Sequence, residues 1–206
     1  METAAHPPRK PGRPLSFDRQ TALRQAMLAF WRHGYETTSI SDLTAAMGVT
    51  APSLYTAFGD KRQLFLEAMR LYAGAPEDLQ QALDRAATAQ DAARDMLTAA
   101  ARAFTGEGTP RGCLLASATA SGSPDAAAVQ GAVADIRRDI IGRLTARIER
   151  DIRPGLLPRT TSAATLAATV VALIQGLSVL ARDGMAQEDL LQVAEQGMQV
   201  WPGPRP

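Results

Sequence analysis

Apolar residues recur along this chain at the spacing of helices. They return every three or four positions, and no stretch alternates strictly between apolar and polar residues as a half-buried strand would. The pattern therefore predicts an all-α fold of about nine helices without internal repeats. The clearest series are Leu23, Ala26, Met27 and Phe30; Ile40, Leu43 and Met47; Ala93, Met96, Leu97, Ala100 and Phe104; Val133, Ile136, Ile140 and Leu144; and Leu166, Val170, Leu173, Leu177 and Leu180.

Helix-capping signals agree with these windows. Ser39 precedes an apolar series with Asp42 three residues on, and Thr88 is followed in the same way by Asp91. Glycine and proline cluster between the windows, as at "AGAP" (73–76), "TGEGTPRG" (105–112) and "RPGLLP" (153–158). The predicted helices are therefore separated by short loops.

The first three predicted helices have the spacing of a helix-turn-helix. A helix over about 18–33 ends at Gly34, and a short one over 40–47 ends at Gly48, which favours a left-handed C-cap. Thr50 can cap a third helix over about 51–58. In a helix-turn-helix the second of the two short helices presents its first residues to the major groove.

The segment "VTAPSLYTAFGDK" (49–61) fits that second helix. Leu54 and Phe58, four apart, would face inward with Val49. The first turn tolerates Pro52, which lacks an N–H. An ordinary three-helix corner with polar outer residues has the same spacing, so spacing alone leaves that alternative open. The residues expected to meet DNA are Ser39, Ser41, Thr50, Ala51, Pro52, Ser53, Tyr55, Thr56 and Lys61.

A longer stretch resembles a known family. "GRPLSFDRQTALRQAM" (12–27) and "GYETTSISDLTAAMGVTAPSLYTAFGDKRQLFLEAM" (34–69) are similar to the DNA-binding region of the TetR family of bacterial transcriptional repressors. The resemblance implies a homodimer that binds double-stranded operator DNA and responds to a small-molecule effector. It also implies weaker phosphate contact by the second helix, since the family often carries a basic residue where this chain has Ser41.

The first 16 residues form a predicted basic arm. Residues 1–62 carry eight basic and five acidic side chains, a net charge of +3 within a chain of net charge +1. Arg9 and Arg13 are the candidates for minor-groove contact by a proline-rich arm. A solvated tail that touches nothing would have the same composition.

The remaining two thirds hold no recognisable catalytic arrangement, metal-ligand spacing or phosphate-binding loop, so neither an enzyme nor a cofactor is predicted. Alanine-rich helices leave room for an effector pocket, although each candidate could equally be plain core. The predicted lining residues are Met69, Met96, Phe104, Cys113, Leu115 and Ile140.

Cys113 is the only cysteine. It follows Arg111 and Gly112 and is expected to open a short helix. A helix N-terminus and a neighbouring guanidinium would favour a reactive thiolate. A small buried hydrophobe is the competing interpretation.

The last two predicted helices, about 162–182 and 187–201, are candidates for a four-helix dimer contact. The predicted contact residues are Leu166, Val170, Leu173, Leu177, Leu180, Leu190, Ala194, Met198 and Trp201. The predicted organisation is an arm at 1–16, a helix-turn-helix domain at 17–61, an effector-binding and dimerisation domain at 62–201 and a tail at 202–206.

These features predict a cytoplasmic, ligand-responsive regulator, with repression implied by the resemblance. No secretory leader is expected, and the apolar run "LAATVVALI" is shorter than the roughly 20 residues of a membrane span. Two alternatives stay open: a helical carrier or enzyme with a non-functional helix-turn-helix, and a nonspecific DNA-coating protein. The near-neutral charge disfavours the latter.

Overall fold

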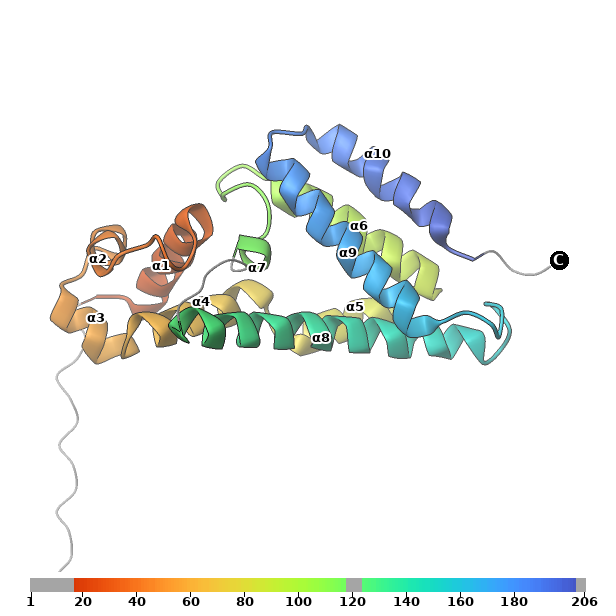
Figure 1. Cartoon of the computed structure of the whole chain (residues 1–206), viewed down its shortest axis with the longest axis horizontal. Helices are drawn as coiled ribbons and strands as arrows, with labels where there is room; N and C mark the ends of the chain where they lie inside the picture. Colours follow the sequence, from red (N-terminus) through yellow and green to blue (C-terminus); the bar gives the residue numbers. More distant parts are fainter. Residues whose placement is uncertain (1–16, 118–123, 203–206) are drawn as a thin grey trace, which may run out of the picture.

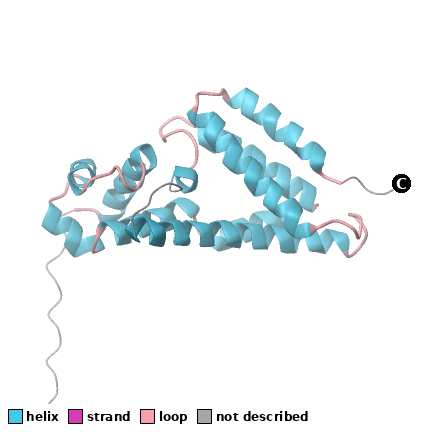
Figure 2. Cartoon of the chain, viewed as in Figure 1, coloured by secondary structure: helices cyan, strands magenta, loops and turns pink. Residues whose placement is uncertain are grey.

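The computed structural model describes residues 17–117 and 124–202, and these ranges contain helices and loops but no strand (Figure 2). The predicted all-α class is confirmed. Arg9 and Arg13 lie outside the described residues. The elements are α1 (Arg19–His33), α2 (Ile40–Met47), α3 (Ala51–Phe58), α4 (Lys61–Ala73), α5 (Pro76–Arg85), α6 (Ala89–Thr105), α7 (Leu114–Ser117), α8 (Pro124–Ile152), α9 (Ala163–Arg182), α10 (Gln187–Gly197) and the 3-10 turn η1 (Met198–Val200).

The helices α1, α2 and α3 form a compact head at one end of the molecule, and α4 leads from it toward α8 (Figure 1). An aromatic cluster joins the head to α4. The ring of Phe65 lies edge-on to Phe30 at 4.9 Å and to Tyr35 at 5.0 Å between centroids. These side chains are buried, so the head and the first turns of α4 share one core.

Arg19 fastens the end of α3 to α4. Its guanidinium donates to both carboxylate oxygens of Glu67 at 2.9 and 2.8 Å and to the carbonyl of Ala57 at 3.2 Å. The same group lies 4.4 Å from the centre of the Phe58 ring. The carbonyl end of α3 is thereby held in a fixed place relative to α4.

The other end of the molecule is a bundle of long helices. The helix α9 packs against α6, α8 and α10, and α8 also packs against α4 and α5 (Figure 1). By length and composition alone, α9 is the one helix in the described ranges that could span a membrane. The apolar run within it was expected to be too short, so this is a difference from the sequence prediction. Part of that apolar surface is buried against the neighbouring helices.

A buried ion pair closes the junction between α5, α6 and α8. Arg147 and Asp151 are paired one turn apart on α8, with only 7% of each side chain exposed. Arg147 also donates to the carbonyls of Leu83, Ala86 and Ala87 at the end of α5, at 3.0 to 3.2 Å. Asp151 accepts from the backbone N–H of Ala89, the first residue of α6, at 2.6 Å. The guanidinium binds the carbonyl end of α5 and the carboxylate binds the N–H end of α6, so both buried charges have partners.

Candidate nucleic-acid interface

A side-chain cap fixes the start of each of the two short helices of the head, α2 and α3. The hydroxyl of Ser39 accepts from the N–H of Asp42 at 3.1 Å, and the Asp42 carboxylate accepts from the N–H of Ser39 at 2.8 Å. These two bonds form the predicted capping box. Gly48 ends α2 at φ +64°, and the hydroxyl of Thr50 accepts from the N–H of Ser53 at 3.3 Å to begin α3. The helix-turn-helix geometry therefore follows from local signals.

The outward side of α3 presents Pro52, Ser53, Tyr55 and Thr56, which we call the reading face. Leu54 and Phe58 are buried on the opposite side, as predicted. Tyr55 is half exposed, at 50%, although it is aromatic. An exposed tyrosine at this position is available to a ligand.

The hydroxyls of the reading face are partly engaged. Ser53 shares a hydrogen bond of 2.9 Å with Thr50, and Thr56 donates to the carbonyl of Pro52 at 2.8 Å. Both oxygens keep the capacity to accept from a ligand. Ser39 and Thr50 act as helix caps, and Ser41 is exposed on the first turn of α2.

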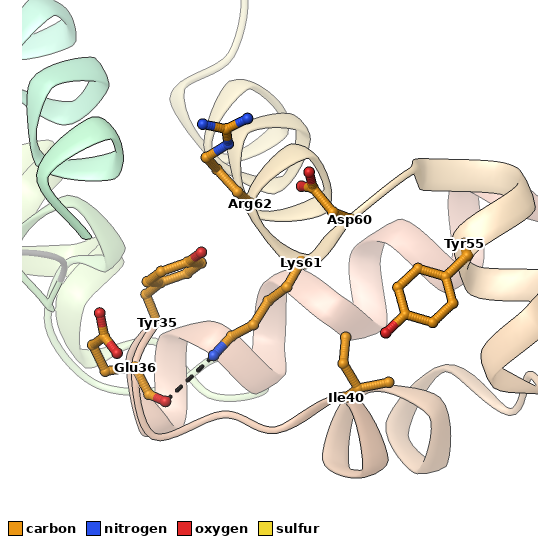
Figure 3. A pocket seen from close by; sticks show the side chains of 7 residues that line it. All are labelled: Tyr35, Glu36, Ile40, Tyr55, Asp60, Lys61 and Arg62. Carbon is orange, nitrogen blue, oxygen red and sulfur yellow. Dashed lines mark hydrogen bonds between the residues drawn. The ribbon is translucent and has the colours of Figure 1, made fainter. Parts of the chain in front are cut away.

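A groove beside the reading face contains Lys61 (Figure 3). The Lys61 ammonium donates to the carbonyl of Glu36 at 3.3 Å and lies 4.7 Å from the centre of the Tyr35 ring. Partial burial lowers the pKa of Lys61 from its ordinary value, and nearby Glu36 opposes that shift. Lys61 is the first residue of α4, and the first backbone N–H groups of a helix also favour an anion such as phosphate.

Arg62 and Tyr35 also line this groove, and neither was predicted from the sequence. Arg62 follows Lys61 directly, so a second cation in the first turn of α4 was the signal for it. Asp60 lies in the same groove, where its carboxylate caps α4 by accepting from the N–H of Gln63 at 2.7 Å. The cap keeps that acidic group turned toward the helix.

A cavity of about 850 Å³ lies among the helices outside the head, which together we call the larger part of the chain. Its wall includes Met96, Phe104, Cys113, Leu115 and Ile140, five of the six residues predicted for a pocket. Met69 does not line it. The Met69 side chain is 1% exposed within the core, where α4 packs on its neighbours, and its prediction as a lining residue is corrected.

The cavity is lined mainly by apolar side chains, with polar groups at a few places. Tyr72, Arg137 and Gln175 belong to its wall and were missed from the sequence. Arg137 donates to the carbonyl of Leu115, while its buried Nε has no partner within the described part of the chain. Such a cavity suits an apolar molecule that carries a polar group.

The family model described as "Bacterial regulatory proteins, tetR family" matches residues 22–68, which include α2 and α3. The HTH-type transcriptional repressor ComR of Escherichia coli (strain K12) is 34% identical over 195 residues, which cover 93% of this chain and 92% of ComR. The chain belongs to the TetR family.

Solved structures agree with this assignment. A cysteine mutant of the TetR family transcriptional regulator CifR, complexed with 26-bp double-strand operator DNA, is 39% identical, with a TM-score of 0.86. The match covers 93% of this TetR-family chain and 100% of that one. A putative TetR transcriptional regulator from Rhodococcus sp. RHA1 is also 39% identical, with a TM-score of 0.60 over 89% of this chain and 99% of that one. The relatives named here are transcriptional regulators.

In this TetR-family chain Cys113 stands where a short helix begins, as expected, but the Arg111 guanidinium does not lie beside its thiol. Cys113 is 4% exposed and stands just before α7, which is a single turn in the described residues. The Arg111 guanidinium points away to the carbonyls of Ala181 and Met185 at the end of α9. The Cys113 sulfur instead accepts a hydrogen bond of 3.3 Å from the Tyr72 hydroxyl.

Most residues predicted for the dimer contact are used in the chain's own core. Within one chain α9 and α10 turn their larger apolar side chains toward α6 and α8, so the prediction is corrected for them. Leu173 and Leu180 are partly buried and stay predictions. The residues buried within the chain are Leu166, Val170, Leu177, Leu190, Ala194, Met198 and Trp201.

Proposed function

We propose that this TetR-family chain is a cytoplasmic repressor that binds near-palindromic operator DNA as a homodimer and releases it when its cavity is occupied or Cys113 is modified. The reading face carries the proposal. A helix-turn-helix presents an exposed Tyr55 and neighbouring hydroxyls on its second helix, and Lys61 stands at the next helix start. CifR, which shares this fold, was solved on operator DNA.

The chemistry of the reading face indicates how it would bind. Lys61 and the Tyr55 hydroxyl suit phosphate oxygens, which position a protein on the duplex. The segment Ala51–Phe58 contains no arginine, the side chain that binds guanine through two hydrogen bonds. Base choice would rest on Ser53, Thr56, methyl contacts and DNA shape.

The second copy would cover the outward side of α9. This side is a ridge of small residues, Ala164, Ala168, Ala172 and Gly176, all exposed. Val179, one turn further, is 55% exposed. Because these residues are apolar and small, two α9 helices could approach closely around a two-fold axis. Such a dimer would hold two reading faces about one DNA turn apart.

Release would follow from differential binding. A ligand or modification that favours a different spacing of the reading faces lowers operator affinity, and a tenfold change needs about 1.4 kcal/mol. The cavity and Cys113 are contiguous, because Cys113 is part of the cavity wall. An electrophile that enters the cavity would therefore meet the thiol.

Salt-dependent binding to a selected duplex tests this function. We expect tight binding that weakens steeply as salt rises, because counterions are released from phosphates. A carrier with a non-functional helix-turn-helix would bind ligand but show no such DNA affinity. Release through Cys113 has a test of its own. N-ethylmaleimide should label the native protein at neutral pH and weaken operator binding, whereas operator binding by a Cys113→Ser control should not change. A native thiol that does not react would exclude release through Cys113.

A further inference from the structure

Trp31 joins the head directly to the wall of the cavity. It lies on α1, is 6% exposed, and its indole N–H donates to the carbonyl of Gly112 at 3.1 Å. The two residues are 81 positions apart in the sequence. The bond is buried, so breaking it without a replacement would leave a polar N–H unsatisfied away from water.

The same indole touches the cavity wall by a second route. The Trp31 ring packs edge-on against Tyr72, with centroids 4.8 Å apart at 81°. Tyr72 lines the cavity and donates its hydroxyl to the sulfur of Cys113. Burial raises the pKa of the Tyr72 hydroxyl far above its ordinary value, so the hydroxyl keeps the proton that it donates.

The segment that Trp31 contacts is fixed to the rest of the cavity. The N–H of Gly112 donates to the carbonyl of Phe104 at 2.9 Å, and the N–H of Cys113 donates to the hydroxyl of Ser178 at 2.8 Å. Arg182 donates to the carbonyl of Cys113 at 3.0 Å.

Gly112 lies at a place where α9 leaves no space for a side chain. Its φ is +79°, and a Cβ there would stand 2.8 Å from the backbone oxygen of Ser178. The 112–113 segment is therefore held by α9 on one side and by the Trp31 indole on the other.

We propose that Trp31 is the positioning residue that couples the state of the cavity to the reading face. Its two contacts hold α1 against Tyr72 and the 112–113 segment, and α1 packs on α2 and α4. A ligand or Cys113 adduct that displaces Tyr72 or the segment breaks these contacts and frees α1 to shift the head. This proposal rests on the proposed function, because it concerns the coupling between cavity and operator.

Linkage makes the coupling measurable without knowing the effector. In this proposal the contact between Trp31 and the 112–113 segment belongs to the DNA-binding arrangement. Operator binding should then stabilise it, and by reciprocity stabilise the cavity wall. The reporters are the amide protons of Gly112 and Cys113, whose hydrogen bonds hold that wall.

The test compares amide hydrogen exchange at 112–113 with and without a selected operator duplex in three full-length proteins. Operator should slow this exchange at least about fivefold in the wild type and in Trp201→Phe, the matched control, whose tryptophan lies at the far end of the chain. Trp31→Phe should still bind operator but show less than about twofold slowing. Equal slowing in all three proteins, or none in an operator-bound wild type, would overturn the proposal.

A second measurement applies if Trp31→Phe does not fold. The chain has two tryptophans, so Trp31 is the sole one in Trp201→Phe. Its emission should change when operator binds, although Trp31 is buried outside the reading face. Unchanged emission in an operator-bound protein would contradict the coupling. A folded protein that binds no selected duplex would instead refute the proposed function, so the two failures are distinct.

Discussion

In the head, the side chains proposed to meet a ligand belong to one short helix and the start of the next, and they point to solvent. Around the cavity, the corresponding side chains come from helices distant in sequence, such as α4, α6, α8 and α9, and they point inward. Caps and glycine turns position the first set locally. Long-range packing and buried hydrogen bonds position the second. Changes to the reading face should therefore alter DNA binding more than stability, whereas changes to the buried contacts of the larger part should alter stability.

The largest expected effect breaks the internal support of the larger part. Asp151→Ala would leave the buried guanidinium of Arg147 without its carboxylate and remove the acceptor for the N–H of Ala89. We expect unfolding by urea to show a loss of about 3–5 kcal/mol. Arg150→Ala removes a partner of the exposed pair with Asp84 and should change the urea midpoint far less, because water and salt screen that pair. Similar losses for the two variants would contradict the stabilising role of the buried ion pair.

The next effect concerns the surface of the larger part that faces outward. Ala172→Arg places a charge in the middle of the α9 ridge and should raise the dimer dissociation constant about 100-fold, or about 2.7 kcal/mol. Sedimentation at several concentrations measures it. Ala99→Arg, on an exposed position of α6, is the control. A dimer unaffected by Ala172→Arg would move the contact elsewhere.

Truncating the reading face should separate binding from stability. Tyr55→Ala removes a half-exposed side chain and should weaken operator binding about tenfold, with the melting temperature nearly unchanged. Fluorescence anisotropy at near-physiological salt gives the affinity. Arg153→Ala, an exposed cation just beyond α8, controls for loss of an exposed side chain far from the head. Equal weakening by both variants would make the binding nonspecific.

The smallest effect tests the local control of the head. Ser39→Ala removes the capping box and should cost about 1 kcal/mol. The Ser39 hydroxyl and backbone N–H lower the pKa of Asp42 below its ordinary 3.8. Because the folded pKa is the lower one, this support is present at neutral pH and is lost as the pH falls through it. Ser39→Ala should therefore lose less stability than the wild type in thermal melts as the pH falls below the ordinary carboxyl pKa of 3.8. A pH profile of stability like that of the wild type would contradict a stabilising role for the Ser39 cap.

The contrast also explains what could be predicted from the sequence. The bounds of α2 and α3 follow from Ser39, Gly48 and Thr50, because caps act within a few residues. Periodicity identified apolar faces but not their partners. It assigned Leu166 and Leu177 to a dimer contact, whereas the chain uses them in its own core. Trp31 and Tyr72 meet through the fold across 41 positions, and no local pattern announces such a contact.

Selection of bound sequences from a random duplex pool at near-physiological salt shows whether the chain recognises a specific operator. The purified chain is compared with a Tyr55→Ala, Lys61→Ala double variant of the same fold. A homodimeric repressor should enrich a near-palindrome whose half-sites lie about one DNA turn apart, and the double variant should not. No enrichment by a folded, dimeric wild type would contradict operator binding by the effector-free protein.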